Sequence, residues 1–216
     1  MRATLIVLGF LMVCPNAHAQ GVLGGRALLA ATEQPLACLG VALVSESGTL
    51  ITRTRTRTDG TFDLPAPTTA GLYRLYFVGM GLELIDTDTL RLDAATDFEL
   101  PFRLALTRSR GTLTAAGLNQ LGIDLEPRAL RTVGTLRYPE QLVADSLEGR
   151  VVVGYAVDTL GRVDPRTTVV LQSTHPGFTA SVRNALNALR YQPAQYSGAA
   201  QCIFATQEFV FTLRRR

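Results

Sequence analysis

Residues 138–173, YPEQLVADSLEGRVVVGYAVDTLGRVDPRTTVVLQS, hold the clearest secondary-structure pattern in the chain. Pro139 suits the first position of a helix, and the apolar face that follows predicts a helix that Gly149 ends. The next nine residues, RVVVGYAVD (150–158), alternate like a strand, and a short turn leads into a second strand over 163–171. The stretch therefore predicts the order helix, strand, strand.

The chain that follows completes an α+β unit. Residues 176–191 predict a second helix, because His175-Pro176 marks a start, apolar residues recur every 3.6 positions, and Pro193 provides a stop. Its apolar face consists of Phe178, Val182, Ala185, Leu186 and Leu189. A last strand over 205–213 alternates Gln207, Phe209 and Phe211 against more polar neighbours. The order α-β-β-α-β predicts helices packed on one face of a three-stranded antiparallel sheet.

The first half of the chain has the period of β-structure throughout. Short apolar or alternating runs recur about every ten residues, and Pro, Gly and Asp clusters separate them. These runs are 22–29, 39–45, 50–58, 73–78, 82–90 and 98–104. Residues 20–106 are therefore predicted to form an all-β sandwich, and residues 107–135 a linker to the second domain.

One stretch of the first half, ITRTRTRTDGTFDLP (51–65), carries three arginines at alternate positions. Period-two geometry places Arg53, Arg55 and Arg57 on one face of a strand and the threonines on the other. Asp59-Gly60 predicts a tight hairpin turn into a return strand. The arginines form either a phosphate-binding patch or the solvated face of an edge strand, and the acidic surroundings favour the solvated face. Whether they meet acidic residues of the second domain stays open.

Several motifs in residues 21–105 resemble the carboxypeptidase regulatory-like domain. The matching segments are residues 24–26, QPL (34–36) leading into VAL (41–43), TDGTF (58–62), GLYRL (71–75) and Gly79. The resemblance implies a transthyretin-like sandwich of seven strands. It also implies a scaffold or adhesion-like module without catalytic activity.

Residues 136–214 resemble the C-terminal domain of TonB, the energy transducer that engages outer-membrane transporters. The shared motifs are Tyr138-Pro139, EGRV (148–151), VD (157–158) with GRV (161–163), residues 185–190 followed by YQPA (191–194), Gly198 and residues 209–213. The resemblance implies that residues 136–216 bind a protein, with the receptor's extended TonB box added to a sheet edge.

The resemblance also supplies candidate contact residues. They are Arg137, Tyr138 and Pro139, together with the backbone of the last strand from Gln207 through Phe209 and Phe211 to Leu213. In the alternative interpretation, Tyr138 and Pro139 only cap and staple the first helix.

The N-terminus predicts export. A positive charge at Arg2, an apolar run over 3–14 and Ala17-His18-Ala19 form a secretory signal over residues 1–19, cleaved before Gln20. The run is shorter than the ~20 residues that span a bilayer, so an uncleaved anchor and a lipoprotein acylated at Cys14 are weaker alternatives. We expect a periplasmic protein that meets a membrane only if this segment is retained.

Charge and cysteine content limit the partners. Residues 20–106 carry seven Arg against ten Asp and Glu, a net charge of −3, and residues 107–216 carry thirteen against eight, a net charge of +5. The mature total of +2 is too small to indicate nucleic acid. Cys38 and Cys202, one in each half, form either a disulfide or two buried thiols.

Nothing in the sequence indicates an enzyme, a cofactor or a metal. Only His175 remains after the signal, neither remaining cysteine lies in a CxxC pair, and no G-x-S-x-G elbow occurs. We expect a non-catalytic, exported protein-binding protein that recognises an extended peptide or sheet edge, and an outer-membrane transporter is one candidate partner. The alternatives are a membrane-anchored TonB-type energy transducer, for which a Pro-rich spacer is missing, and an envelope protein whose β-sandwich does the binding.

Overall fold

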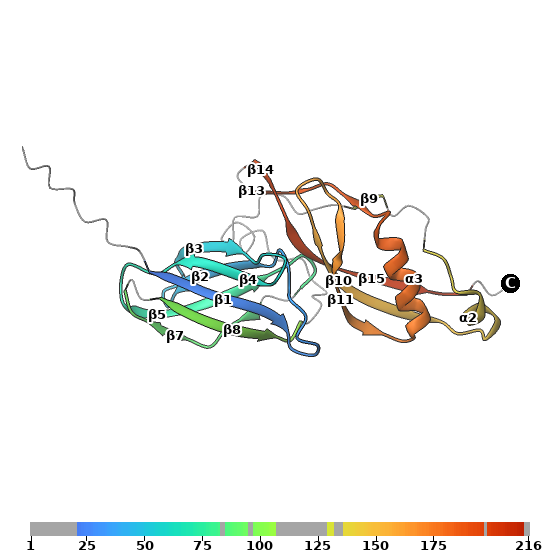
Figure 1. Cartoon of the computed structure of the whole chain (residues 1–216), viewed down its shortest axis with the longest axis horizontal. Helices are drawn as coiled ribbons and strands as arrows, with labels where there is room; N and C mark the ends of the chain where they lie inside the picture. The colour runs from blue at the N-terminus through green and yellow to red at the C-terminus, as the bar shows by residue number, and fades with distance from the viewer. Residues whose placement is uncertain are drawn as a thin grey trace, which may run out of the picture.

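The computed structural model describes residues 21–82, 85–94, 97–106, 129–131, 136–196 and 198–213. They form two β-rich domains, one after the other along the long axis of the molecule (Figure 1). The predicted signal and most of the predicted linker lie outside the described residues. No helix in the described part of the chain has the length and apolar character needed to cross a membrane.

The N-terminal domain is a sandwich of two sheets, as predicted. One sheet has the order β4-β1-β8, and the other has the order β3-β2-β5-β6 with β7 also on β5. The bounds are β1 Val22–Leu29, β2 Gly40–Ser45, β3 Leu50–Arg55, β4 Thr61–Pro65, β5 Gly71–Val78, β6 Ile85–Asp86, β7 Leu90–Leu92 and β8 Phe98–Leu104. Strand β1 pairs antiparallel with β4 and parallel with β8. The single strand predicted over 82–90 is instead the two short strands β6 and β7.

The prediction that Asp59-Gly60 joins two paired strands of a hairpin is wrong. Strand β3 pairs with β2 and strand β4 with β1, so the turn carries the chain from one sheet to the other. The local turn itself is present, since Gly60 has φ +82° and its amide donates to the Arg57 carbonyl at 2.9 Å. Strand β3 lies at a sheet edge, as predicted.

The C-terminal domain has the predicted α-β-β-α-β order around an antiparallel sheet β11-β10-β15. The bounds are α2 Glu140–Ala144, β10 Gly149–Val157, β11 Val163–Ser173, α3 Pro176–Leu186 and β15 Ile203–Phe211. Helix α3 packs against one face of this sheet (Figure 1). Its N-cap is His175, whose Nδ1 accepts a hydrogen bond from the Gly177 amide at 3.0 Å.

Two smaller sheets extend this domain beyond the prediction. Strand β9 (Ala129–Arg131) lies within the predicted linker and pairs with β12 (Arg190–Tyr191), while β13 (Ala194–Tyr196) pairs with β14 (Ala199–Gln201). Because β12 needs an extended backbone, helix α3 ends at Leu186 rather than near residue 191.

The first helix also differs from its prediction. It ends at Ala144 rather than at Gly149, which begins β10. Its N-cap is Pro139, so the proline stands one position before the helix that it was predicted to begin.

The two domains share part of one hydrophobic core. Val169 and Phe204 of the C-terminal domain belong to the same buried cluster as Leu82 and the interior of the sandwich. As a result every residue from Val151 to Val157 in β10 is buried, on both faces of the sheet, whereas the sequence predicted one buried face. Cys38 and Cys202, with Cα atoms 5.6 Å apart, form a disulfide across the same junction.

Candidate functional site: the outer edge of strand β15

Strand β15 is an edge strand of the C-terminal sheet. It pairs antiparallel with β10 along its whole length, from Gly149 opposite Phe211 to Val157 opposite Ile203. In such a ladder, residues alternate between those whose backbone groups bond to the neighbouring strand and those whose groups point away from it. The outward groups are a template for another extended chain.

The N-terminal domain already occupies the first part of this edge. The Phe204 amide donates to the Cys38 carbonyl at 2.8 Å. The Met80 amide donates to the Phe204 carbonyl at 2.8 Å, and the Thr206 amide donates to the Met80 carbonyl at 2.9 Å, which together form a parallel bridge between Met80 and Ala205. Met80 therefore acts as a one-residue added strand and identifies the even-numbered residues of β15 as the outward ones.

The same alternation places the backbone of Val210 on the outer edge, beyond the segment that Met80 occupies. The side chain of Val210 is 58% exposed, unlike those of its neighbours Phe209 and Phe211. Those two phenylalanines direct their backbone groups towards β10. The end of β15 therefore presents an outward backbone position beside an exposed apolar side chain.

The predicted contact residues on β15 direct their side chains into the domain. Phe209 and Phe211 belong to the buried cluster under α3. Gln207 accepts hydrogen bonds through Oε1 from the hydroxyls of Tyr155 and Tyr191, at 2.7 and 2.8 Å, and those hydroxyls lie 2.6 Å apart. Burial, reinforced by Tyr191, raises the pKa of Tyr155. The side chains of these three residues therefore pack or bond within the domain.

The other predicted contacts lie at the far end of β15. The ring of Tyr138 packs edge-on against Phe178 and Phe211, with ring centres 5.6 and 5.5 Å apart, and its hydroxyl donates to the Leu147 carbonyl at 2.5 Å. The Arg137 carbonyl accepts a hydrogen bond from the Ser181 hydroxyl. Pro139 is the N-cap of α2, and the fold brings Tyr138 beside Phe211 but away from Gln207, so the contact role of Tyr138 and Pro139 stays a prediction.

Sequence reasoning missed the residues that contact the edge from the other domain, namely Cys38 and Met80. The only local pattern at these contacts was the turn Gly79-Met80-Gly81, and a turn pattern does not predict a contact with β15. Their role depends on docking between segments more than 120 positions apart in the sequence.

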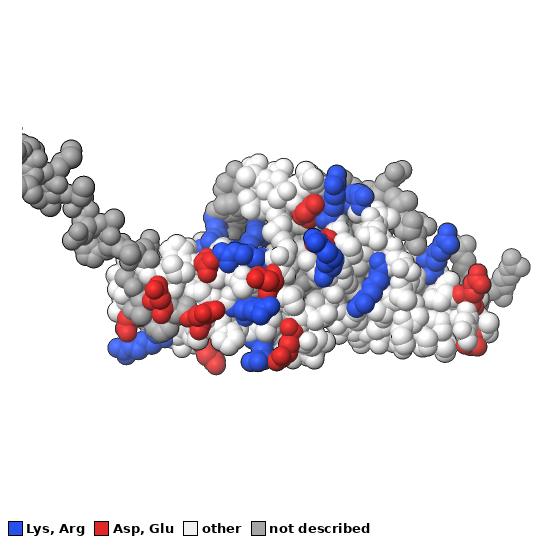
Figure 2. Space-filling view, viewed as in Figure 1, with Lys and Arg blue, Asp and Glu red and all other residues white. Residues whose placement is uncertain are grey.

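The surface of the molecule is unevenly charged. On the face shown in Figure 2, acidic and basic side chains are mixed over the N-terminal sandwich, and the C-terminal domain shows mainly basic ones except at its far end. Within the described residues, no group of three or more His, Cys, Asp and Glu is placed to hold a metal ion.

Comparison with known proteins assigns the C-terminal domain to a family. Residues 135–213 match the family described as Gram-negative bacterial TonB protein C-terminal. The solution structure of the Pseudomonas aeruginosa TonB C-terminal domain is 31% identical to this chain, with 43% of this chain and 92% of that one covered and a TM-score of 0.37. No curated protein matches the sequence.

Two other solved structures have lower identity. Klebsiella pneumoniae 5-hydroxyisourate hydrolase is 22% identical, with 43% of this chain and 94% of that one covered and a TM-score of 0.32. A putative carbohydrate-binding protein from Bacteroides uniformis is 11% identical, with 90% and 99% covered and a TM-score of 0.36.

Proposed function

We propose, on the premise that this chain belongs through residues 135–213 to the TonB C-terminal domain family, that it binds an extended segment of a partner protein along the outer edge of β15. The observation that carries this proposal is the parallel bridge of Met80 to Ala205, since the edge already accepts an added strand in its first part. The proposed role is binding and includes no catalysis.

The proposed contact is made by backbone groups of the partner. Main-chain hydrogen bonds provide affinity in strand addition, while alternate side chains of the added strand provide specificity. On this chain the added strand lies beside the outward backbone of Val210, whose side chain is exposed, and Tyr138 borders the same end of β15 through Phe211. The segment that Met80 occupies shortens the available edge, so we expect a brief partner segment.

The proposed partner is an envelope protein, such as an outer-membrane transporter that carries a TonB box. The disulfide between Cys38 and Cys202 supports an oxidising compartment outside the cytoplasm. N-terminal sequencing of the mature protein separates the two forms of the proposal. A start at Gln20 supports a periplasmic adaptor, and retention of residues 3–14 supports a membrane-anchored energy transducer.

A substitution at Val210 tests the proposal. Val210→Pro removes an outward amide without removing a hydrogen bond to β10, because proline is tolerated where the amide of an edge strand faces solvent. Val210→Ala is the matched control, since it shortens the same side chain and keeps the amide. Binding of TonB-box peptides to the full mature chain is measured by calorimetry.

We expect Val210→Pro to weaken peptide binding about tenfold and Val210→Ala to weaken it at most about threefold, because a net hydrogen bond contributes about 1 kcal/mol and the ring also hinders approach. Equal peptide affinity of the folded wild-type and Val210→Pro proteins would contradict binding at this edge. Failure of all TonB-box peptides to bind the folded wild type at millimolar concentration would also contradict the proposal.

A further inference from the structure

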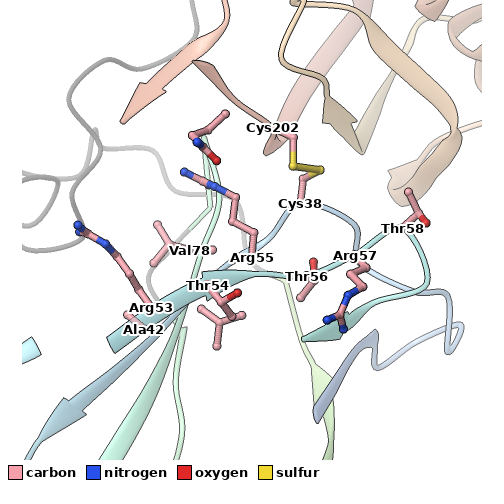
Figure 3. A pocket seen from close by; sticks show the side chains of 13 residues that line it. Cys38, Ala42, Arg53, Thr54, Arg55, Thr56, Arg57, Thr58, Val78 and Cys202 are labelled. Atoms are coloured by element: carbon pink, nitrogen blue, oxygen red, sulfur yellow. A yellow bond between two sulfur atoms is a disulfide. The ribbon is translucent and has the colours of Figure 1, made fainter. Parts of the chain in front are cut away.

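A cavity lies at the junction of the two domains, apart from the outer edge at Val210. It has a volume of about 700 Å³, and strands β2 and β3 line it together with Gln201 and Cys202 of the C-terminal domain. The disulfide between Cys38 and Cys202 joins its two walls (Figure 3). Sites for small molecules typically have volumes of roughly 300–1,000 Å³ and often lie at domain interfaces.

Two arginines of β3 give this cavity its charge. Arg53 and Arg55 extend from the same face of the strand, and Arg57 points the opposite way (Figure 3). Arg57 pairs with Asp63 at 2.5 Å within its own domain. All three arginines line the cavity, and the guanidinium of Arg57 is bonded to Asp63.

Arg55 is an unusual cation for its position. It is half-buried, and no carboxylate of the described residues lies within ion-pair distance of it, whereas Arg57, Arg103 and Arg166 each have one. Burial, and then repulsion by Arg53, lowers the pKa of its guanidinium. A charge taken from water without a partner costs free energy, and a bound anion would offset that cost.

We propose that this cavity binds a small molecule that carries a phosphate or carboxylate group, held by the guanidinium groups of Arg55 and Arg53. Guanidinium is a planar fork of donors that matches the oxygen atoms of both groups in bidentate fashion. Gln201, a lining residue from the C-terminal domain, carries a side-chain amide that can donate to the same group. A ligand seated here contacts both domains at once.

The test uses the full mature chain and two probes, inorganic phosphate and acetate, at constant ionic strength with chloride as the balancing anion. Arg55→Gln removes the proposed anchor, and Arg166→Gln, at an exposed pair with Asp164 outside the cavity, is the matched loss of charge. Calorimetry gives the affinity of each variant for each probe. The probe that binds more tightly identifies phosphate or carboxylate as the group recognised.

We expect Arg55→Gln to weaken binding about tenfold or more, as for the loss of a charge-assisted hydrogen bond, and Arg166→Gln to change it less than twofold, about the limit of such measurements. Without the probes, Arg55→Gln should melt at the wild-type temperature or above it, because it removes a repelled, half-buried charge. The probe that binds more tightly should raise the melting temperature of the wild type and leave that of Arg55→Gln unchanged.

Failure of the wild type to bind both phosphate and acetate at about 50 mM would overturn the proposal, as would equal affinities of the wild type and folded Arg55→Gln. If Arg55→Gln does not fold, Arg53→Gln decides by the same criteria. Binding that weakens equally in Arg166→Gln indicates attraction to the overall charge of the protein and also overturns the proposal.

Discussion

Gly154 is the residue that lets the two domains share a core. A Cβ atom at this position would lie against the ring of Phe204, 2.9 Å from Cε1, and that ring is fully buried. Phe204 in turn belongs to the cluster that includes the interior of the sandwich. A missing side chain on β10 thus makes room for a neighbouring ring that packs between the domains.

We expect Gly154→Ala to destabilise the folded chain by about 1–3 kcal/mol, the usual cost of overpacking a core. Gly71→Ala is the control, since the nearest atom to its Cβ would lie at an ordinary 3.4 Å. Urea denaturation gives both free energies of unfolding. Equal, small effects of the two substitutions would show that Phe204 moves aside without cost.

The paired hydroxyls of Tyr155 and Tyr191 make stability depend on alkaline pH. Burial raises the pKa of both groups above the ordinary 10.0, so the unfolded chain loses these protons first as the pH rises. Their contribution to stability is fully present below pH 10 and decreases above it, by about 1.4 kcal/mol per pH unit for each tyrosine. Tyr155→Phe should make this decrease shallower. Parallel curves of unfolding free energy against pH, for wild type and variant above pH 10, would refute the assignment.

At the scale of elements, the loop of Gly79, Met80 and Gly81 seats the N-terminal domain on β15. Gly81 has φ +73°, and a Cβ there would lie 2.5 Å from the Thr206 hydroxyl oxygen. Gly48 has a similar φ of +83° with nothing within 4 Å of its Cβ position. An alanine at position 48 would therefore add backbone strain alone, whereas an alanine at position 81 would add similar strain and a clash with Thr206.

Gly48→Ala should cost about 1 kcal/mol from the left-handed backbone alone. Gly81→Ala should cost about 1–3 kcal/mol more, because the added methyl group also displaces Thr206. Denaturant unfolding of the two variants measures this difference. If both substitutions have the same effect, the loop is not held tightly against β15.

Sequence patterns predicted most elements but not all of their partners. Strands β1, β5, β10 and β15 follow from alternation and turn residues, which are local. The pairing of β3 does not follow, because Asp59-Gly60 specifies a turn and leaves open whether the flanking strands bond to each other. The burial of both faces of β10 and the contact of Met80 with Thr206 depend on segments that are far apart in the sequence. The residue pattern of a single strand cannot predict such contacts.

At the scale of the whole molecule, the disulfide links segments 164 positions apart in the sequence and joins the two domains. Sequence alone left this pair open, since only the fold brings the two Cα atoms within bonding distance. Replacing both Cys38 and Cys202 with alanine should lower the unfolding free energy by about 3–5 kcal/mol, as for a long closed loop. Calorimetry should still show a single transition, because the shared core remains. Two separate transitions in the variant would mean that the disulfide alone couples the domains.

Hydrogen exchange at β15 tests the central claim of strand addition most directly. Binding of a TonB-box peptide should slow exchange of the outward amide of Val210, while the amides of Phe209 and Phe211, already bonded to β10, keep their rates. Peptide binding that leaves the Val210 amide unprotected, or that protects only residues away from β15, would contradict the proposed site.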